Sequence, residues 1–228
     1  MAPTTDRANA WPASAEALVA TQRRLAAARP DAWVPGSSFR VGACFVCFAR
    51  GGSGPGAAGD PAWAAAACDG RTAVVGGTAG APYEPGLLAL REGPLLEAAV
   101  RALAEPPDVL LVDATGRDHP RRAGLALHLG AVLGLPTAGV THRPLLAAGA
   151  WPPDEGGART PLLLEGEVVG VWLRTRRGRR PLAVHAAWRT DAESAAAIVV
   201  AALRGTRTPE PLRRARQVAR TARSRGLG

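Results

Sequence analysis

The sequence predicts an α/β protein whose mixed sheet starts as an antiparallel meander, continues with parallel strands and carries helices on both faces. Two observations predict this class. Three β-prone segments follow one another in the first third of the chain, and short apolar strands then alternate with segments of helical spacing. The 228 residues contain no internal repeat and no domain-sized linker, so we expect one domain over residues 1–228.

The first third is expected to contain one helix and the meander. Ser14 suits the N-cap of a helix that runs to Ala28, and Pro30 stands beyond its end. The first strand is predicted over residues 39–49 and ends in the glycine-rich segment RGGSGPGAAGD. Two further strands, 62–68 and 72–75, flank Asp69-Gly70, a dipeptide that favours a tight hairpin turn.

The middle third alternates helix and strand. The segment PYEPGLLALREGPLLEAAVRALAEPP, residues 82–107, opens with two prolines and a glycine and then takes helical spacing. Residues 109–112 form a short continuous apolar run, which is typical of a strand buried on both faces. A helix over 124–133 and a strand over 136–140 follow.

The C-terminal third is expected to add strands, a helix and a basic end. The segments PLLLEGEVVGVWLRTRR and RPLAVHAAW predict two or three strands. The segment DAESAAAIVVAALRG predicts a helix that Asp191 or Thr190 caps and that Gly205 ends. The arginine-rich residues that follow form either a surface helix or a basic tail.

Charge and hydropathy narrow the class of protein. The formal net charge is +9 and every basic residue is arginine, which favours a polyanionic partner such as nucleic acid. Apolar runs are shorter than the roughly 18 residues that a membrane span needs. The N-terminal residues lack the basic and then apolar pattern of a signal peptide. We therefore expect a cytoplasmic, monomeric protein without a membrane partner.

The cysteines predict packing rather than chemistry. Cys44 and Cys47 form a C-x-x-C, but they lie in a predicted strand, where residues three apart face opposite sides. The pair is therefore not expected to converge on one metal, and without an export signal a disulfide is not favoured. Small buried side chains are the favoured interpretation.

Two acids mark a candidate site. Asp113 ends the apolar run in LLVDATGRDHPRR, and strand ends at the carboxyl edge of an open sheet display functional groups. The alternative is that Asp113 caps the next helix. Glu92 lies near the start of a predicted helix, where the helix dipole favours an anion. Two such carboxylates can hold a hard divalent cation together with water and substrate phosphate, as in metal-dependent phosphodiester hydrolysis.

Three segments carry a family resemblance. The strings PYEPGLLALREGPLLEAA, PDVLLVDATGRDHPRRAGLALHLGAVLGLPTAGV and RGTRTPEP closely resemble endonuclease V, a family of repair nucleases with a ribonuclease H-like fold. The resemblance covers residues 11–211 and leaves 212–228 as a basic C-terminal segment. It implies hydrolysis of phosphodiester bonds with Mg²⁺ or Mn²⁺ near inosine or other deaminated bases in DNA or RNA.

Matching positions imply the site residues. Glu92 and Asp113 correspond to metal ligands of the family and would form the catalytic pair. The P-Y-x-P-G segment of the family is a wedge that enters the duplex beside the deaminated purine. The residues expected to contact nucleic acid are the wedge residues Pro82, Tyr83, Pro85 and Gly86, the loop residues Gly116, His119, Arg121 and Arg122, and His142, which stands where the family has a lysine.

Two metal-site positions of the family are altered. Cys44 stands in place of an aspartate in the first strand, and Trp188 stands in place of a histidine in a G-H-R segment. A protonated thiol is a poor ligand for Mg²⁺, and an indole neither binds a hard cation nor carries a proton. The resemblance with these departures implies a weak or altered endonuclease.

Other interpretations remain open on the same residues. The chain is alternatively a catalytically inactive family member that binds deaminated or distorted nucleic acid, or a nuclease in which Cys44 engages Mn²⁺ or Zn²⁺. Asp118 and His119 lie close enough in sequence to approach a displaced ion, although a solvated loop with a phosphate contact is the favoured interpretation. His185 is expected to face the side of its strand opposite to Trp188.

Overall fold

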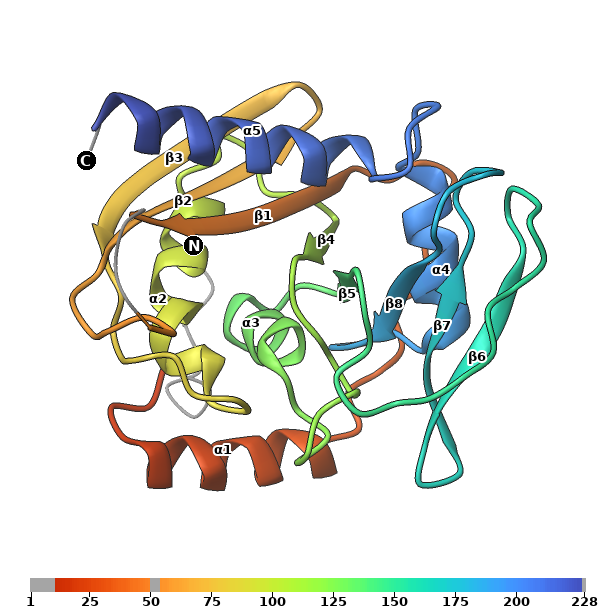
Figure 1. The fold of residues 1–228 in the computed structure, drawn as a ribbon, viewed down its shortest axis with the longest axis horizontal. Helices are drawn as coiled ribbons and strands as arrows, with labels where there is room; N and C mark the ends of the chain where they lie inside the picture. The colour runs from red at the N-terminus through yellow and green to blue at the C-terminus, as the bar shows by residue number, and fades with distance from the viewer. Residues whose placement is uncertain (1–10, 50–53, 227–228) are drawn as a thin grey trace.

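The computed structural model describes residues 11–49 and 54–226. The chain alternates strands and helices in the order expected of a mixed α/β protein (Figure 1). The elements are α1 Ala15–Ala27, β1 Val41–Phe48, β2 Pro61–Cys68, β3 Arg71–Thr78, α2 Leu88–Arg101, β4 Val109–Val112, α3 Leu125–Leu133, β5 Thr137–Thr141, β6 Arg159–Leu164, β7 Glu167–Leu173, β8 Leu182–Ala186, α4 Ala192–Ala201 and α5 Glu210–Arg225.

The strands form a mixed sheet in the order β3-β2-β1-β4-β5-β8-β7-β6. Strands β1, β4 and β5 are parallel to one another, and the other neighbouring pairs are antiparallel. The predicted meander followed by parallel strands is confirmed. Because the parallel strands lie at the centre, the carboxyl end of β4 opens between two neighbours, and Asp113 follows it directly.

The hairpin predicted at Asp69-Gly70 is confirmed. Both residues have positive φ, 47° and 76°, which is the backbone of a tight turn between antiparallel strands. Cys68 pairs with Arg71 across the turn, and β3 extends from there to Thr78. The strand is longer than predicted because it continues through Gly76 and Gly77, which carry no β-propensity of their own but pair with β2.

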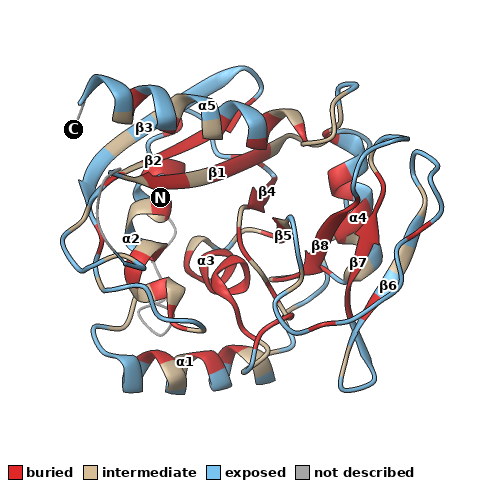
Figure 2. Cartoon of the chain, viewed as in Figure 1, coloured by how far each residue is buried: buried red, intermediate tan, exposed pale blue. Residues whose placement is uncertain are grey.

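Helices cover both faces of the sheet, and the alternation of side chains along the central strands assigns each face (Figure 1). Cys44, Leu110 and Val112 pack in one apolar cluster with residues of α1, α2 and α3. Ala43, Val109 and Leu111 pack in another with residues of α4 and with Leu212 of α5. Figure 2 shows the buried residues concentrated in these central strands and in the helix faces that meet them.

The arginine-rich C-terminal residues form the helix α5 and pack on the sheet, which decides between the two predicted possibilities. Leu212, Ala215, Ala219 and Ala222 are buried, whereas most arginines of the helix are exposed. The helix runs along β1 and β2 (Figure 1). None of the helices in the described part of the chain is long and apolar enough to cross a bilayer.

Cys44 and Cys47 face opposite sides of β1, as predicted. Cys44 lies in the cluster with α2, and Cys47 lies with Ala65 and Ala219 under α5. The packing interpretation of the C-x-x-C is therefore confirmed.

Candidate functional site

A cavity of about 200 Å³ at the carboxyl end of β4 joins the two segments that the sequence singled out. Tyr83, Pro85 and Gly86 line it from the loop before α2, and Asp113 and His119 line it from the loop after β4. The cavity is completed by Gln22, Glu84, Leu88, Ala89, Ala114, Thr115, Leu125, Thr141 and Leu145. The wedge segment and the acid that follows β4 thus belong to one site, although they are about thirty residues apart in sequence.

The wedge is exposed at its tip and held firmly at its base. Tyr83 is 46% exposed. The carbonyl oxygen of Gly86 accepts hydrogen bonds from Gln22 Nε2 at 3.0 Å and from Arg121 Nη2 at 2.7 Å, and it lies 3.2 Å from His119 Nε2. Arg121 Nε also donates to Gln22 Oε1 at 2.5 Å. Gly86 has φ +81°, which glycine adopts without strain.

These contacts correct the role predicted for His119. The side chain is 3% exposed, and burial lowers its pKa to about 4, so the ring is neutral at physiological pH and turned toward Gly86. His119 therefore supports the wedge from inside and is not placed to contact a phosphate. Arg121 is engaged in the same support through two of its donors.

Two other residues of the loop after β4 are buried, which corrects the prediction of a solvated loop. A Cβ atom on Gly116 would lie 2.1 Å from the carbonyl oxygen of Ala186, so glycine is needed for the loop to pack on β8. The contact of Gly116 with phosphate stays a prediction. Asp118 is 0% exposed, and its carboxylate accepts the backbone N–H groups of Leu145, Leu146 and Ala147 at 2.6 to 2.8 Å.

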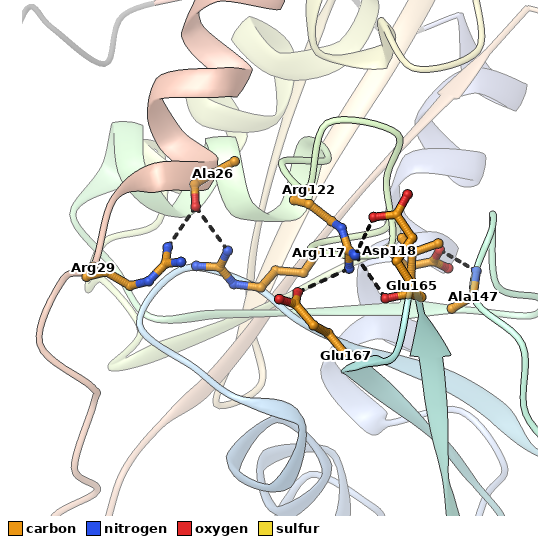
Figure 3. Close-up of polar contacts among 9 residues, drawn as sticks. Ala26, Arg29, Arg117, Asp118, Arg122, Ala147, Glu165 and Glu167 are labelled. Carbon is orange, nitrogen blue, oxygen red and sulfur yellow. Dashed lines mark hydrogen bonds and ion pairs between the residues drawn. The ribbon is translucent and has the colours of Figure 1, made fainter.

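Arg122 is occupied by acids of the β6–β7 hairpin (Figure 3). Its Nη2 lies 3.0 Å from Glu165 Oε2, and its Nη1 lies 3.6 Å from Glu167 Oε2. Nearby, Arg29 and Arg117 both donate to the carbonyl oxygen of Ala26 (Figure 3). Arg122 thus forms an ion-paired link between the loop and the hairpin, and its phosphate contact stays a prediction.

Three of the four positions of the predicted metal site come together. Cys44 pairs with Val112 across the β1–β4 ladder, one residue before Asp113, and Glu92 of α2 lies close enough for the acids to affect one another. Burial raises the pKa of Glu92 to about 8, and the charge of Asp113 adds to that rise. Burial also raises the pKa of the Cys44 thiol well above its ordinary value, with further contributions from Asp113 and Glu92. Burial therefore favours the neutral thiol of Cys44 in the metal-free protein, and the alternative in which Cys44 engages Mn²⁺ or Zn²⁺ stays a prediction.

Arg216 of α5 is the residue that the sequence reasoning missed. Its Nη2 lies 2.9 Å from Asp113 Oδ1, and its Nε donates to Asp113 Oδ2 at 3.1 Å. Both carboxylate oxygens of Asp113 are therefore bound by one guanidinium, the paired geometry that arginine favours with carboxylates. The sequence contained only a weak signal, an arginine-rich helix in which no single arginine stands out.

His142 lies beside this ion pair and next to Arg207. Its Nδ1 is 3.0 Å from Arg207 Nη1. Burial, and then the charges of Arg216 and Arg207, lower the pKa of His142. The neutral ring of His142 is therefore favoured where the family has a lysine, and the neighbouring arginines supply positive charge at this position.

Trp188 lies away from the site, which corrects its predicted place. Its backbone exchanges hydrogen bonds with Thr137, the first residue of β5, at 2.9 and 3.1 Å. Strand β8 runs antiparallel to β5, so the end of β8 meets the start of β5. Asp113 follows the opposite end of the neighbouring strand β4. The tryptophan therefore neither lines the cavity nor fills a metal position.

In this structure the candidate metal ligands are ion-paired or favoured in their neutral forms, and they do not form a set of free oxygen donors. Among the residues that the structure describes, no group of three or more histidine, cysteine, aspartate or glutamate side chains is placed to hold a metal. Asp113 gives both oxygens to Arg216, and burial raises the pKa of Cys44 and raises that of Glu92 to about 8. Mg²⁺ and Ca²⁺ sites instead require several available oxygen ligands.

Comparisons with known proteins identify the relatives of this chain. The family model described as endonuclease V matches residues 68–217. Endonuclease V of Methanopyrus kandleri is 45% identical over 155 residues, which cover 68% of this chain and 67% of the relative. The matching segments cover between 57% and 67% of the length of the first curated relatives.

Solved structures match over nearly the whole chain. The crystal structure of endonuclease V from Streptomyces avermitilis superposes with a TM-score of 0.82 and 34% identity, covering 96% of each chain. Endonuclease V of Ciona intestinalis, solved with a 24mer DNA containing an inosine followed by a ribo-adenosine, has a TM-score of 0.72. At 21% identity, with coverage of 92% of this chain and 98% of the other, that structure supports the fold alone. The predicted ribonuclease H-like architecture is confirmed.

Proposed function

The chain belongs to the endonuclease V family. We propose that it binds nucleic acid containing inosine or another deaminated purine, as family membership suggests, and that it does not cut the strand. The wedge Pro82–Gly86 would enter the strand beside the altered base, and the cavity below it would receive that base.

Recognition is supported by the position and exposure of the wedge. Tyr83 is half exposed above the cavity, and an aromatic ring there can stack on a base. The base of the wedge is held by Gln22 and Arg121, so the loop is ordered before a strand arrives. The net charge of +9 favours approach of a polyanion. The choice of inosine-containing strands follows from family membership and from the resemblance of the P-Y-x-P-G segment to the family's wedge beside a deaminated purine.

The single observation that argues against cleavage is the ion pair between Asp113 and Arg216. It takes both oxygens of the acid that the family resemblance assigns to the metal. Cys44 and Glu92, the neighbouring positions, are favoured in their neutral forms by burial. We therefore derive no hydrolytic step at this site.

A second candidate is slow cleavage that depends on Mg²⁺ or Mn²⁺. The observation in its favour is that Asp113 lies close enough to Glu92 to raise its pKa. A binding surface alone has little use for two adjacent acids. This candidate is the weak endonuclease implied by the sequence resemblance.

One experiment separates the two candidates. Labelled single-stranded DNA, duplex DNA and RNA, each with one inosine or with adenosine in its place, are incubated with the protein in EDTA, Mg²⁺ or Mn²⁺. We expect tighter binding to the inosine strands by fluorescence anisotropy and no product on a denaturing gel. Tyr83→Ala is expected to reduce the preference for inosine, with Trp151→Ala, another exposed aromatic residue outside the cavity, as the matched control. Cleavage by the wild-type protein that disappears in Asp113→Ala would establish the second candidate instead.

A further inference from the structure

The Asp113–Arg216 pair is more than a surface contact. The side chains are 23% and 13% exposed, so solvent screens their attraction less than that of an exposed pair. A guanidinium that binds both oxygens of a carboxylate also fixes the orientation of each group. The pair places a permanent positive charge beside the acid at the end of β4.

The fold holds Arg216 in this position. The helix α5 is anchored by Leu212, Ala215 and Ala219, which are all fully buried. The Arg216 guanidinium also lies 5.8 Å from the centre of the Phe45 ring on β1. Phe45 and Asp113 come from neighbouring parallel strands, so the arginine is fixed by the sheet and by its own helix.

Arg216 connects Asp113 to a basic groove on the outer side of α5. A cavity of about 650 Å³ there is lined by Arg216 together with Thr208, Arg213, Gln217, Arg220, Thr221 and Ser224. Its lining thus consists of arginine, amide and hydroxyl side chains, which all donate hydrogen bonds to phosphate oxygens. A guanidinium carries more N–H donors than the two that Asp113 takes, so Arg216 retains donors for a second anion.

We propose that Arg216 is the resident cation of this site. It neutralises Asp113 where a divalent ion would otherwise bind, and it gives its remaining N–H groups to a phosphate of a strand that runs along the groove beside Arg213 and Arg220. The neutralisation of Asp113 by Arg216 is independent of the proposed function. The contact of Arg216 with a phosphate rests on the proposed function, because it requires that the protein binds a nucleic-acid strand. The consequence is that nucleic acid binds here without metal.

The first test measures metal binding. Mn²⁺ is titrated by calorimetry into the wild-type protein, Arg216→Ala and Arg216→Ala/Asp113→Asn. We expect binding only in Arg216→Ala, because this change alone frees Asp113 beside Glu92, and loss of that binding in the double variant. Equal Mn²⁺ binding by wild type and Arg216→Ala, or none by either, would overturn the proposal.

The second test measures strand binding in EDTA with plain and inosine-containing single-stranded DNA. Because Arg216→Ala removes a charged hydrogen-bond donor, we expect it to lower the affinity for the strand about tenfold. The slope of log affinity against log salt concentration should fall in magnitude by about one. Arg214→Ala is the control, because Arg214 is an exposed arginine of the same helix that does not line the groove. Arg216→Lys, which keeps the charge and loses the planar fork, is expected to bind with intermediate affinity. Equal losses in Arg216→Ala and Arg214→Ala would contradict the proposal.

The two proposals fail in different ways. Arg216-dependent binding to plain and inosine strands alike would leave the resident-cation inference standing and remove the preference for deaminated bases. A preference for inosine that EDTA abolishes would show that binding needs a metal. This result would overturn the resident-cation inference and leave the preference for deaminated bases standing. The Asp113→Asn variant separates the two proposals further. If a metal bound by Asp113 held the strand, this change would weaken strand binding. If Arg216 is the cation, the change frees its guanidinium and is expected to strengthen strand binding in EDTA.

Discussion

Glu92 is a side chain whose charge depends strongly on its surroundings. Its pKa rises from an ordinary value of 4.5 to about 8, first because it is largely removed from water and then because Asp113 is near. A carboxyl group with a raised pKa in the folded state stabilises the fold while it is protonated. That contribution is fully present below about pH 4.5 and is lost as the pH rises toward 8.

We therefore expect Glu92→Gln to become more stable than the wild-type protein as the pH increases. Glutamine has a similar shape and cannot ionise, so the gain should reach about 4 kcal/mol near pH 8.5 and vanish near pH 4. Urea unfolding at several pH values measures it. Glu155→Gln makes the same substitution at an exposed loop position and is the control. A stability difference that does not change with pH would show that Glu92 is ionised in the folded protein.

The helix α2 shows how one contact can reverse a local preference. Gly93 lies inside the helix, where alanine is normally favoured by about 1 kcal/mol. A Cβ atom at this position would lie 2.3 Å from the ring of Trp11. That ring is held by a hydrogen bond from its Nε1 to Glu97 Oε2 at 2.7 Å and by the ring of His128, so it has little freedom to move.

Gly93→Ala is expected to destabilise the protein in spite of its better helix propensity. Overpacking of this kind costs about 1 to 3 kcal/mol, which exceeds the gain in propensity. In a Trp11→Ala background the same change should be stabilising, because the ring is gone. Thermal unfolding of the four proteins forms a double-mutant cycle. The same sign of the Gly93→Ala effect in both backgrounds would exclude the ring as the cause.

At the scale of the whole molecule, α5 connects the end of the chain to its beginning. The helix packs on β1 and β2, and through Arg216 it reaches the end of β4 (Figure 1). Residues of α5 therefore share apolar clusters with residues of β1, the first strand of the chain. We propose on this basis that residues 1–228 fold as one domain.

Changes in α5 are then expected to affect the unfolding of the entire protein. Leu212→Ala should lower the free energy of unfolding by about 2 to 4 kcal/mol, because the side chain is fully buried. Removal of residues 206–228 should abolish the cooperative transition, since it uncovers one face of β1 and β2. Urea unfolding followed by circular dichroism measures both, with Arg214→Ala expected to differ from wild type by less than about 0.5 kcal/mol. An unchanged transition in the shortened chain would make α5 a separate unit.

Local patterns in the sequence determined the elements and the family. The Asp69-Gly70 turn, the buried run before Asp113 and the opposite orientations of Cys44 and Cys47 all follow from neighbouring residues, because backbone conformation and side-chain periodicity act over short separations. The wedge and the two acids were found through motifs for the same reason.

Only the tertiary structure decided which residues meet. Arg216 reaches Asp113 across 103 positions, and no periodicity distinguishes it from the other arginines of α5. Gly86 is held by Gln22 and Arg121, which come from two further segments. Trp188 lies at the end of the strands opposite to Asp113, because β8 is antiparallel to β5. Charge in such a site depends on burial and on partners brought from distant strands and helices. The sequence by itself therefore determined where the site is, and the packing of α5 on the sheet decided that its cation is a guanidinium.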